Sequence, residues 1–305
     1  MIEHTVHTLP HGIDLACRTC GDAGRPLLVF LHGFPEAAFV WDDLHEHFAQ
    51  ATNGGYRCVA PNLRGYAPSS APADAAAYRA KHLIEDIAAL IAAETGSPST
   101  PAAAVIAHDW GGAVAWGLAA SRPACLQRLA IINSPHPATF LRELQSSTAQ
   151  QQASAYMNFL IRPDAEALLA AGDYRRLWEF FTKMGAAEGP HAWLTDTVKA
   201  QYRAVWDQGL TGALNYYRAS PLRPPRSDDD TGAPLVLPRE LTEVLLPTLV
   251  IWAMADTALP PALLVGLESH VPQMTLVRID GATHWVIHEQ PALVIQHLQA
   301  FLQPQ

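Results

Sequence analysis

The stretch "VIAHDWGGAVAW" (residues 105–116) predicts a strand, a sharp turn and a helix in immediate succession. An apolar run leads into His108, and a helix-like run follows Gly111 and Gly112. Small residues on both sides suit a turn that tolerates little side-chain bulk. Asp109 occupies the turn, so we expect a carboxylate to stand at the end of the strand. A simple capping aspartate for the following helix is the alternative.

The same rhythm continues on both sides of this stretch. Short, nearly all-apolar runs alternate with segments whose apolar residues recur at helical spacing, such as Leu83, Ile84 and Ile87. Such runs are typical of a parallel sheet that is covered by helices on both faces. Strands are expected within residues 26–35, 56–70, 102–108, 126–137, 247–256 and 274–285, and helices within 81–94, 111–123 and 291–302.

An insertion interrupts this alternation after His136. Between residues 137 and 222 there is no clear buried parallel strand but a series of aromatic-rich, helix-like pieces, followed by the loose stretch "PLRPPRSDDDTGAP" (221–234). We therefore predict one α/β domain with a mostly parallel central sheet and a helical lid. Residues 1–136 and 236–305 form its core, and residues 137–235 form the lid.

Composition narrows the possible partners. The 305 residues carry a formal net charge of −9 without a basic cluster, which argues against nucleic acid and anionic membrane surfaces. The N-terminus does not read as a signal peptide, and we find no stretch of about 18 or more uncharged apolar residues that could span a membrane. We expect a cytoplasmic protein that is a monomer or a homodimer.

Cys17 and Cys20 form a C-x-x-C pattern, which is found in redox and metal sites. The surrounding residues look like a strand, in which side chains three positions apart point to opposite faces. No second C-x-x-C completes a zinc set. We expect reduced thiols, no metal and no organic cofactor.

Three chemically active side chains follow strands in a meaningful order. Asp109 lies at the strand-to-helix turn, Asp256 ends the strand-like run "TLVIWAMAD", and His284 follows "TLVRID" in the loop "GATHW". Nucleophile, acid and histidine occur in this chain order in α/β-hydrolases. We therefore predict a catalytic triad in which Asp256 orients His284 and stabilises its imidazolium form.

The segment "FLHGFPE" follows an early strand and supplies a candidate oxyanion hole. In this kind of fold one backbone N–H comes from such a loop, and the other comes from the residue after the nucleophile. These would be the N–H groups of Phe34 and Trp110. An ordinary Gly-Phe-Pro turn is the competing interpretation.

The sequence resembles the epoxide hydrolase and haloalkane dehalogenase branch of the α/β-hydrolase superfamily, closest to soluble epoxide hydrolases. The resemblance covers nearly the whole chain and departs from the usual pattern at Asn62 and Ala67, where the family usually has Asp and Gly. The matching segments are "HGFPE", "PNLRGYAPSS", "AHDWGGAV", "INSPHP", "ALNYYR", "MADTALPP" and "GATHWVIHEQP".

A carboxylate nucleophile suits attack on a saturated carbon. A serine would form an ether there, which activated water does not readily cleave, whereas Asp109 forms an ester with a carbonyl. His284 can drive water onto that carbonyl while two N–H groups hold the oxyanion. The resemblance therefore implies an epoxide hydrolase, a hydrolase acting on ether bonds, that converts a small apolar epoxide and water into a vicinal diol.

Epoxide opening also needs a proton donor, because it produces an alkoxide. By resemblance, the lid segment "LNYYR" places one donor on Tyr217, with Tyr216 as an aromatic substrate contact beside it, and "SAYMNFLIRP" places the other on Tyr156. Trp110 and Phe34 are expected to contact the substrate as well. Aromatic packing within the lid is the alternative role for the tyrosines.

Two other functions stay open. A haloalkane or haloacid dehalogenase would use the same triad, although haloalkane dehalogenases often carry Asn at the position of Phe34, and fluoroacetate dehalogenases resemble "HDRGARV" where this chain has Trp110 and Ala113. Some dehalogenases place the acid after the preceding strand, where this chain has Asn133 and Ser134. A binding protein without turnover is the third possibility. Asp280 is expected in a solvated loop.

Overall fold

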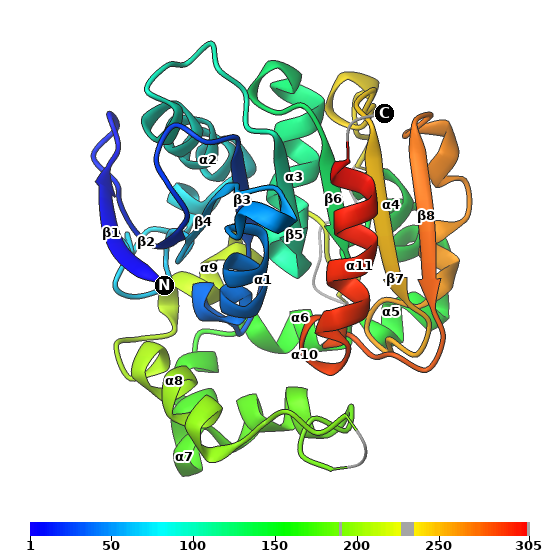
Figure 1. Cartoon of the computed structure of the whole chain (residues 1–305). Coiled ribbons are helices and arrows are strands. Elements are labelled where there is room, and N and C mark those ends of the chain that lie inside the picture. Colours follow the sequence, from blue (N-terminus) through cyan, green and yellow to red (C-terminus); the bar gives the residue numbers. More distant parts are fainter. Residues whose placement is uncertain (189–190, 227–234, 304–305) are drawn as a thin grey trace.

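One eight-stranded sheet organises the part of the chain that the structure, a computed structural model, describes: residues 1–188, 191–226 and 235–303. The strand order is β1-β2-β4-β3-β5-β6-β7-β8 (Figure 1). The strands are β1 (Glu3–Thr8), β2 (Asp14–Cys20), β3 (Leu27–Leu31), β4 (Arg57–Pro61), β5 (Ala104–His108), β6 (Leu129–Ile132), β7 (Thr248–Ala253) and β8 (Met274–Ile279).

Strands β3 to β8 run parallel to one another. Strands β1 and β2 form an antiparallel edge beside β4. Every residue of β3, β5, β6 and β7 is buried, as their continuous apolar sequences predict. Strand β1 was not expected. Its sequence, EHTVHT, is polar because an edge strand faces solvent on much of its surface.

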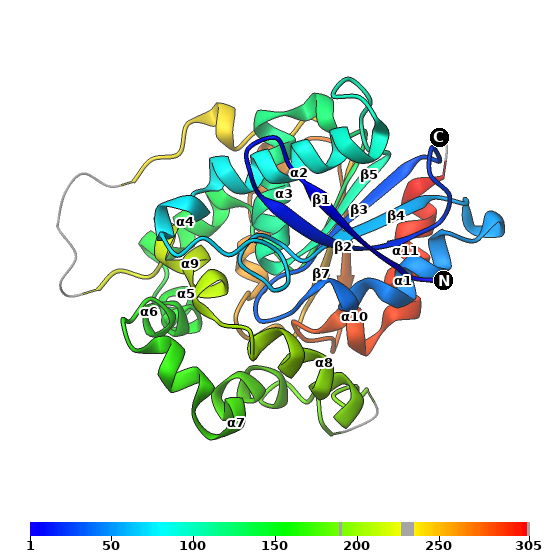
Figure 2. The same ribbon diagram turned by 90° about the vertical axis from the view of Figure 1, so that its left-hand side faces the viewer.

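Helices cover both faces of the sheet. Figure 2 shows α1 (Asp42–Phe48) and α11 (Pro291–Leu302) on one face and α2 (Ala80–Thr95) and α3 (Asp109–Ser121) on the other. The short helix α10 (Val286–Glu289) precedes α11. Brief 3-10 turns connect these elements: η1 (Ala38–Trp41), η2 (Ala51–Asn53), η3 (Ala75–Tyr78), η4 (Pro123–Cys125), η5 (Arg239–Leu241), η6 (Pro261–Leu264) and η7 (Leu267–Ser269).

The segment predicted as a lid, residues 137–235, contains six helices in the part that the structure describes, with turns and irregular stretches between them. Its longest helix is broken at 171–174, where four residues leave helical geometry. The part of the expected loose stretch 221–234 from residue 227 onward lies outside the described residues, and the domain boundaries stay a prediction. The helices are α4 (Pro137–Ser146), α5 (Thr148–Ala153), α6 (Ala155–Leu160), α7 (Ala165–Thr182), α8 (Asp196–Trp206) and α9 (Thr211–Ala219).

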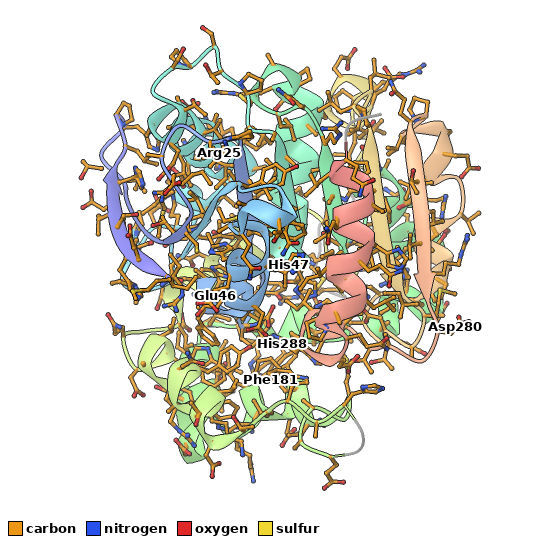
Figure 3. All side chains as sticks on the ribbon, viewed as in Figure 1. Arg25, Glu46, His47, Phe181, Asp280 and His288 are labelled. Carbon is orange, nitrogen blue, oxygen red and sulfur yellow. The ribbon has the colours of Figure 1, made fainter. Side chains whose placement is uncertain are left out.

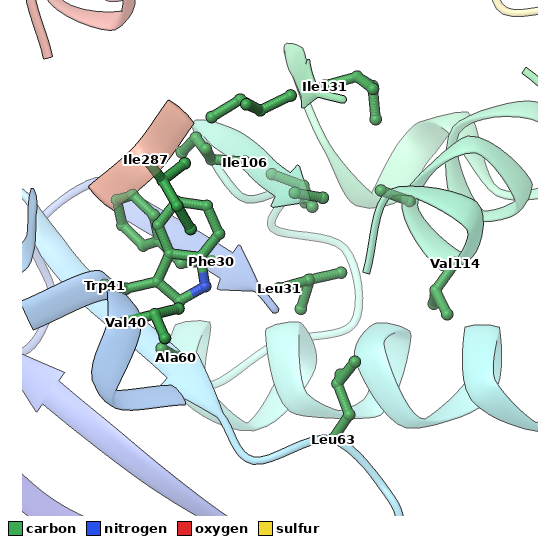
Figure 4. Close-up of a cluster of buried hydrophobic side chains, with 14 of the residues drawn as sticks. Phe30, Leu31, Val40, Trp41, Ala60, Leu63, Ile106, Val114, Ile131 and Ile287 are labelled. Atoms are coloured by element: carbon green, nitrogen blue, oxygen red, sulfur yellow. The ribbon is translucent and has the colours of Figure 1, made fainter. Parts of the chain in front are cut away.

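The hydrophobic core lies beneath the carboxyl ends of the central strands. Figure 4 shows side chains of β3, β5 and β6 packed together with Trp41 and Val114. Trp41 is fully buried against Phe30, with 5.5 Å between the ring centroids. This packing gives the strand ends, and the loops that follow them, a rigid base.

Gly111 sets how closely α3 approaches the sheet. A Cβ at this position would lie 2.3 Å from the carbonyl oxygen of Leu31, which belongs to the backbone of β3 and cannot move aside cheaply. Gly112 is similarly close to the side chain of Ser134, at 2.3 Å. The small residues after Asp109 are therefore required for packing on the neighbouring strands as well as for the turn.

Gly111→Ala is expected to lower the free energy of unfolding by about 1–3 kcal/mol, because it overpacks a rigid backbone contact. Urea unfolding measures the change. Ser121→Ala, at the exposed end of the same helix, is the control and should stay within about 0.5 kcal/mol. Equal stabilities of the two variants would contradict the packing argument.

Candidate active site

The candidate nucleophile Asp109 stands at the turn between β5 and α3. Its φ is +49°, a left-handed conformation that is uncommon for a residue with a side chain. The hydroxyl of Ser134 donates a hydrogen bond of 2.6 Å to the Asp109 backbone carbonyl and helps to hold this turn. Strained backbone of this kind is often found at functional sites.

The loop after β3 contacts one oxygen of the Asp109 carboxylate. The backbone N–H of Phe34 donates to Asp109 Oδ1 at 2.7 Å. Gly33 makes this approach possible, because a Cβ there would lie 2.3 Å from Asp109 Cβ. Oδ1 is thus held, and Oδ2 is the oxygen that faces the candidate histidine. The N–H of Trp110 follows directly in the chain, and its role in an oxyanion hole stays a prediction.

His284 lies between the two carboxylates named in the sequence. Its Nε2 is 3.7 Å from Asp109 Oδ2, and its Nδ1 is 2.7 Å from Asp256 Oδ2. Asn133 supports this arrangement from the end of β6. Its amide donates to Asp256 Oδ2 at 2.8 Å and accepts the N–H of Ala253 at 2.9 Å. Asn133 therefore fixes the position of the Asp256 carboxylate, which in turn holds the ring of His284.

Burial and neighbouring charges oppose each other at this pair. Burial would raise the pKa of Asp256, but His284 and hydrogen bonds from Asn133 and the Leu259 N–H hold that pKa below its usual range. Burial would lower the pKa of His284, but the carboxylates of Asp256 and Asp109 outweigh it and raise the pKa to about 9. The resting site therefore favours an imidazolium between two carboxylates.

Tyr156 and Tyr217, the candidate proton donors, lie across from Asp109. Tyr217 packs edge-on against Trp110 and Phe34, with ring centroids 5.0 and 5.3 Å away. Tyr156 is 6.2 Å from Tyr217 between centroids. Burial, followed by the nearby negative charge of Asp109, raises the pKa of Tyr156. Burial also raises the pKa of Tyr217 well above its ordinary value, so both phenols stay protonated at neutral pH.

A cavity of about 270 Å³ opens beside Asp109. Its lining includes Asp109, Trp110, Tyr156, Tyr216 and Tyr217. The hydroxyl of Tyr216 is already used, since it donates to the backbone carbonyl of Arg64 at 2.8 Å. Tyr216 can therefore offer only its ring to a ligand. The ring of Phe34 packs on Tyr217 and Phe180 and is not among the lining residues.

Glu36 was missed in the sequence, although it ends the quoted segment "FLHGFPE". Its carboxylate is fully buried and accepts hydrogen bonds from His108 at 3.1 Å, Tyr202 at 3.1 Å and His288 at 2.6 Å. Burial would raise the pKa of Glu36, but the hydrogen bonds from the two histidines hold it well below its usual range. The signal was a charged residue directly after a Gly-Phe-Pro loop.

His108 links this carboxylate to the candidate triad. One ring nitrogen faces Glu36, and the other faces the backbone carbonyl of His284 at 2.9 Å. Both neighbours are hydrogen-bond acceptors, so His108 joins the loop that carries Glu36 to the loop that carries His284. Figure 3 labels His288 and Phe181, and the ring of Trp193 contacts both, with centroid distances of 3.9 Å to His288 and 5.3 Å to Phe181.

Asn62, where the family usually has Asp, uses both ends of its amide. Its oxygen accepts the N–H of Ala38 at 2.8 Å, and its nitrogen donates to the carbonyl of Ala67 at 2.5 Å. An aspartate could accept the first bond but could not donate the second. The amide of Asn62 thus ties the loop to Ala38 and Ala67, and neither bond involves Asp109, Asp256 or His284.

The remaining candidates lie apart from this site. Asp280 is exposed beyond the end of β8, as expected (Figure 3).

All four cysteines are free thiols, and burial raises the pKa of Cys17 and Cys58. In the described part of the chain, no cluster of three His, Cys, Asp or Glu side chains is arranged to hold a metal ion. Within the same residues, no helix combines the length and apolarity needed to cross a membrane.

A family model described as the alpha/beta hydrolase fold matches residues 26–291. The chain belongs to the α/β-hydrolase family. It is 36% identical over 298 residues to the AB hydrolase superfamily protein YfhM of Bacillus subtilis (strain 168), covering 97% of this chain and 96% of YfhM. It is also 30% identical over 287 residues to Epoxide hydrolase 4 of Mus musculus, covering 92% and 74% of the two chains.

Solved structures agree with this assignment. One described as "Novel epoxide hydrolases belonging to the alpha/beta hydrolases superfamily in metagenomes from hot environments" superposes with a TM-score of 0.86 at 36% identity and covers 100% of both chains. The predicted α/β-hydrolase fold and the resemblance to epoxide hydrolases are thus confirmed. The roles of individual site residues stay predictions.

The raised pKa of His284 predicts how stability depends on pH. The folded state binds its proton more tightly than the unfolded state, so the stabilisation is fully present below pH 6.5 and is lost as the pH rises to about 9. The free energy of unfolding should fall by up to about 3 kcal/mol across this window. Urea unfolding at a series of pH values measures the change.

His284→Gln is the matched control, because glutamine does not titrate. The variant should lose the decline between pH 6.5 and 9. The buried His32 and His136 have lowered pKa values of about 4 and about 3, so their effects fall below this window. An unchanged slope in His284→Gln would contradict the assignment.

Proposed function

We propose that this protein is an epoxide hydrolase that forms a covalent ester on Asp109. The observation that carries the proposal is the division of labour at the Asp109 carboxylate. Oδ1 accepts the Phe34 N–H, whereas Oδ2 faces His284, and Asp109 lines a cavity together with two tyrosines that keep their protons at neutral pH. The epoxide hydrolases among its relatives and structural neighbours support the same reaction class.

In the first step, Asp109 Oδ2 attacks one oxirane carbon. The Oδ2–C bond forms as the C–O bond of the strained ring breaks, and the ring oxygen takes a proton from Tyr156 or Tyr217. The other phenol donates a hydrogen bond to the same oxygen, and solvent later returns the lost proton. Phenols with raised pKa values hold their protons until an alkoxide develops nearby.

In the second step, His284 removes a proton from water, which attacks the Asp109 carbonyl carbon. The developing charge on Oδ1 is stabilised by the Phe34 N–H and, by our proposal, the Trp110 N–H. The bond between this carbon and Oδ2 breaks, and the departing diol, which carries Oδ2, takes the proton that His284 had removed from water. The water oxygen stays in the carboxyl group of Asp109, which releases its remaining proton to solvent.

Esterification itself prepares the histidine for this step. The negative charge of Asp109 is one of the influences that raise the pKa of His284. When Asp109 becomes a neutral ester, that influence disappears and the imidazolium loses its proton more easily. Asp256, held by Asn133, keeps the ring oriented throughout.

The expected setting of the enzyme is also part of the proposal. We propose a cytoplasmic monomer or homodimer that needs only a small apolar epoxide and water. Four free thiols are compatible with a reducing compartment. The cavity lining is dominated by apolar side chains, which suits a poorly hydrated substrate.

Trapping the ester tests the covalent step. Asp109→Ala should abolish turnover, whereas His284→Gln should still form the ester but fail to hydrolyse it. Mass spectrometry of His284→Gln after addition of an epoxide should show one substrate mass added to the peptide that contains Asp109. Normal turnover by Asp109→Ala would refute the mechanism.

Removing the phenols tests the leaving-group assistance. General acid catalysis contributes about 10²–10⁴-fold, so Tyr156→Phe and Tyr217→Phe should each lose a sizeable part of kcat/KM for an epoxide. The double variant should lose nearly all of it. Tyr174→Phe, which removes a lid phenol bonded to Asp207, is the control and should stay active.

A haloalkane panel separates the epoxide hydrolase from the dehalogenase alternative. A departing halide needs no proton, so the double tyrosine variant should reduce any dehalogenation far less than epoxide turnover. Near-normal epoxide turnover by that variant would mean that the two tyrosines only pack the lid.

A further inference from the structure

The cavity beside Asp109 continues well past the residues that the proposed chemistry requires. Along α3 it is lined by Ala113, Gly117 and Ser121, which follow Asp109 at intervals of four residues. Residues spaced in this way lie on one face of a helix. With a rise of about 1.5 Å per residue, the line from Asp109 to Ser121 is about 18 Å long.

The exposure of α3 supports a real groove along this line. Its neighbours Gly112 and Val114 are buried, yet Ala113 is exposed in the middle of the helix and Gly117 is half-buried. An alanine that faces the core layer is normally covered by a side chain. Here the space beside it belongs to the cavity that begins at Asp109.

The opposite wall is apolar and comes from distant parts of the chain. Leu83 and Ile84 belong to α2, Leu222 follows α9, and Leu237 and Leu241 precede β7. Turn η5, which ends at Leu241, packs against α3. We call this space the α3 groove, defined by Leu83, Ile84, Ala113, Gly117, Leu222, Leu237 and Leu241.

Two features indicate the chemistry of the occupant. Among the described residues that line the cavity, Asp109 is the single charged side chain. Leu241 is 51% exposed at the outer end of the groove. Beyond Asp109, a charged group would therefore find no ion-pair partner along the lining, whereas hydrocarbon would cover apolar surface that is now open.

We propose that the α3 groove binds the hydrocarbon chain of a neutral, long-chain aliphatic epoxide whose oxirane lies at one end, against Asp109. The inference rests on the proposed epoxide hydrolase function and adds the substrate class. The oxirane sits between Asp109 and the tyrosines, and the chain runs along Ala113 and Gly117 toward Leu241. Gly117 lets the side chain of Ile84 approach α3 closely, since a Cβ there would lie 2.7 Å from Ile84 Cδ1.

The test is a chain-length series of 1,2-epoxyalkanes, from 1,2-epoxybutane to 1,2-epoxydodecane, each below its solubility limit. Burying one methylene group contributes enough free energy for about a fourfold change in an equilibrium constant. We expect kcat/KM of the wild-type enzyme to rise about two- to fourfold per added methylene until the chain reaches the outer end of the groove.

Gly117→Leu should block the groove, because the new side chain and the displaced Ile84 fill the same space. It should abolish the rise with chain length while turnover of 1,2-epoxybutane remains, since Gly117 lies two helical turns beyond Asp109. A folded Gly117→Leu enzyme that keeps the full wild-type chain-length dependence would overturn the proposal.

Leu241→Ala keeps the test decisive if Gly117→Leu does not fold. It should lower kcat/KM for 1,2-epoxydodecane about fivefold and leave 1,2-epoxybutane unchanged. Leu245→Ala is the matched control, because Leu245 is 58% exposed nearby but does not line the cavity. Equal effects of the two substitutions on the long epoxide would also overturn the proposal.

The chain-length series distinguishes a failure of the proposed epoxide hydrolase function from a failure of the proposed role of the α3 groove. If the wild-type enzyme hydrolyses none of the epoxides, the proposed function itself fails. If it hydrolyses 1,2-epoxybutane and 1,2-epoxydodecane with equal kcat/KM, epoxide hydrolysis stands and the role of the α3 groove is refuted.

Discussion

The buried carboxylate of Glu36 joins the parts of the molecule that must stay in register. It lies in the loop after β3 and accepts hydrogen bonds from β5 through His108, from α8 of the lid through Tyr202 and from α10 through His288. A fully buried charge is costly unless every lone pair finds a donor. The loop can therefore hardly move without breaking several bonds together, and the indole N–H of Trp206 adds a bond to the carbonyl of Pro35.

This constraint reaches the candidate nucleophile through one backbone N–H. Because the loop is held, Phe34 stays 2.7 Å from one oxygen of Asp109 and leaves the other facing His284. His108 adds a second link, since the ring that bonds Glu36 also contacts the carbonyl of His284. The helical segment that follows β6 thus contributes to the position of Asp109 as well as to the wall of the cavity. Preorganised donors of this kind need little rearrangement during reaction.

Much of the site could be predicted because its residues occur at recognisable places along the chain. Asp109, Asp256 and His284 each follow an apolar run, and parallel strands bring such positions to one edge of a sheet. Strand β1 escaped prediction because an edge strand does not need apolar residues. Glu36 and Asn133 escaped because their roles depend on partners far away in sequence, Tyr202 and Asp256. Nothing local distinguishes a buried, bonded polar residue from an exposed one.

The sequence alone determined the α/β-hydrolase fold, the helical insertion and the order of the candidate catalytic residues, because hydrophobic periodicity and short motifs are local properties of the chain. Only the tertiary structure decided which oxygen of Asp109 is held, how Asn133 supports Asp256 and where Tyr156 and Tyr217 lie relative to each other. The tertiary structure alone also revealed the α3 groove. A cavity exists where side chains from several distant segments fail to meet, and that depends on how the whole chain packs rather than on any one stretch of it.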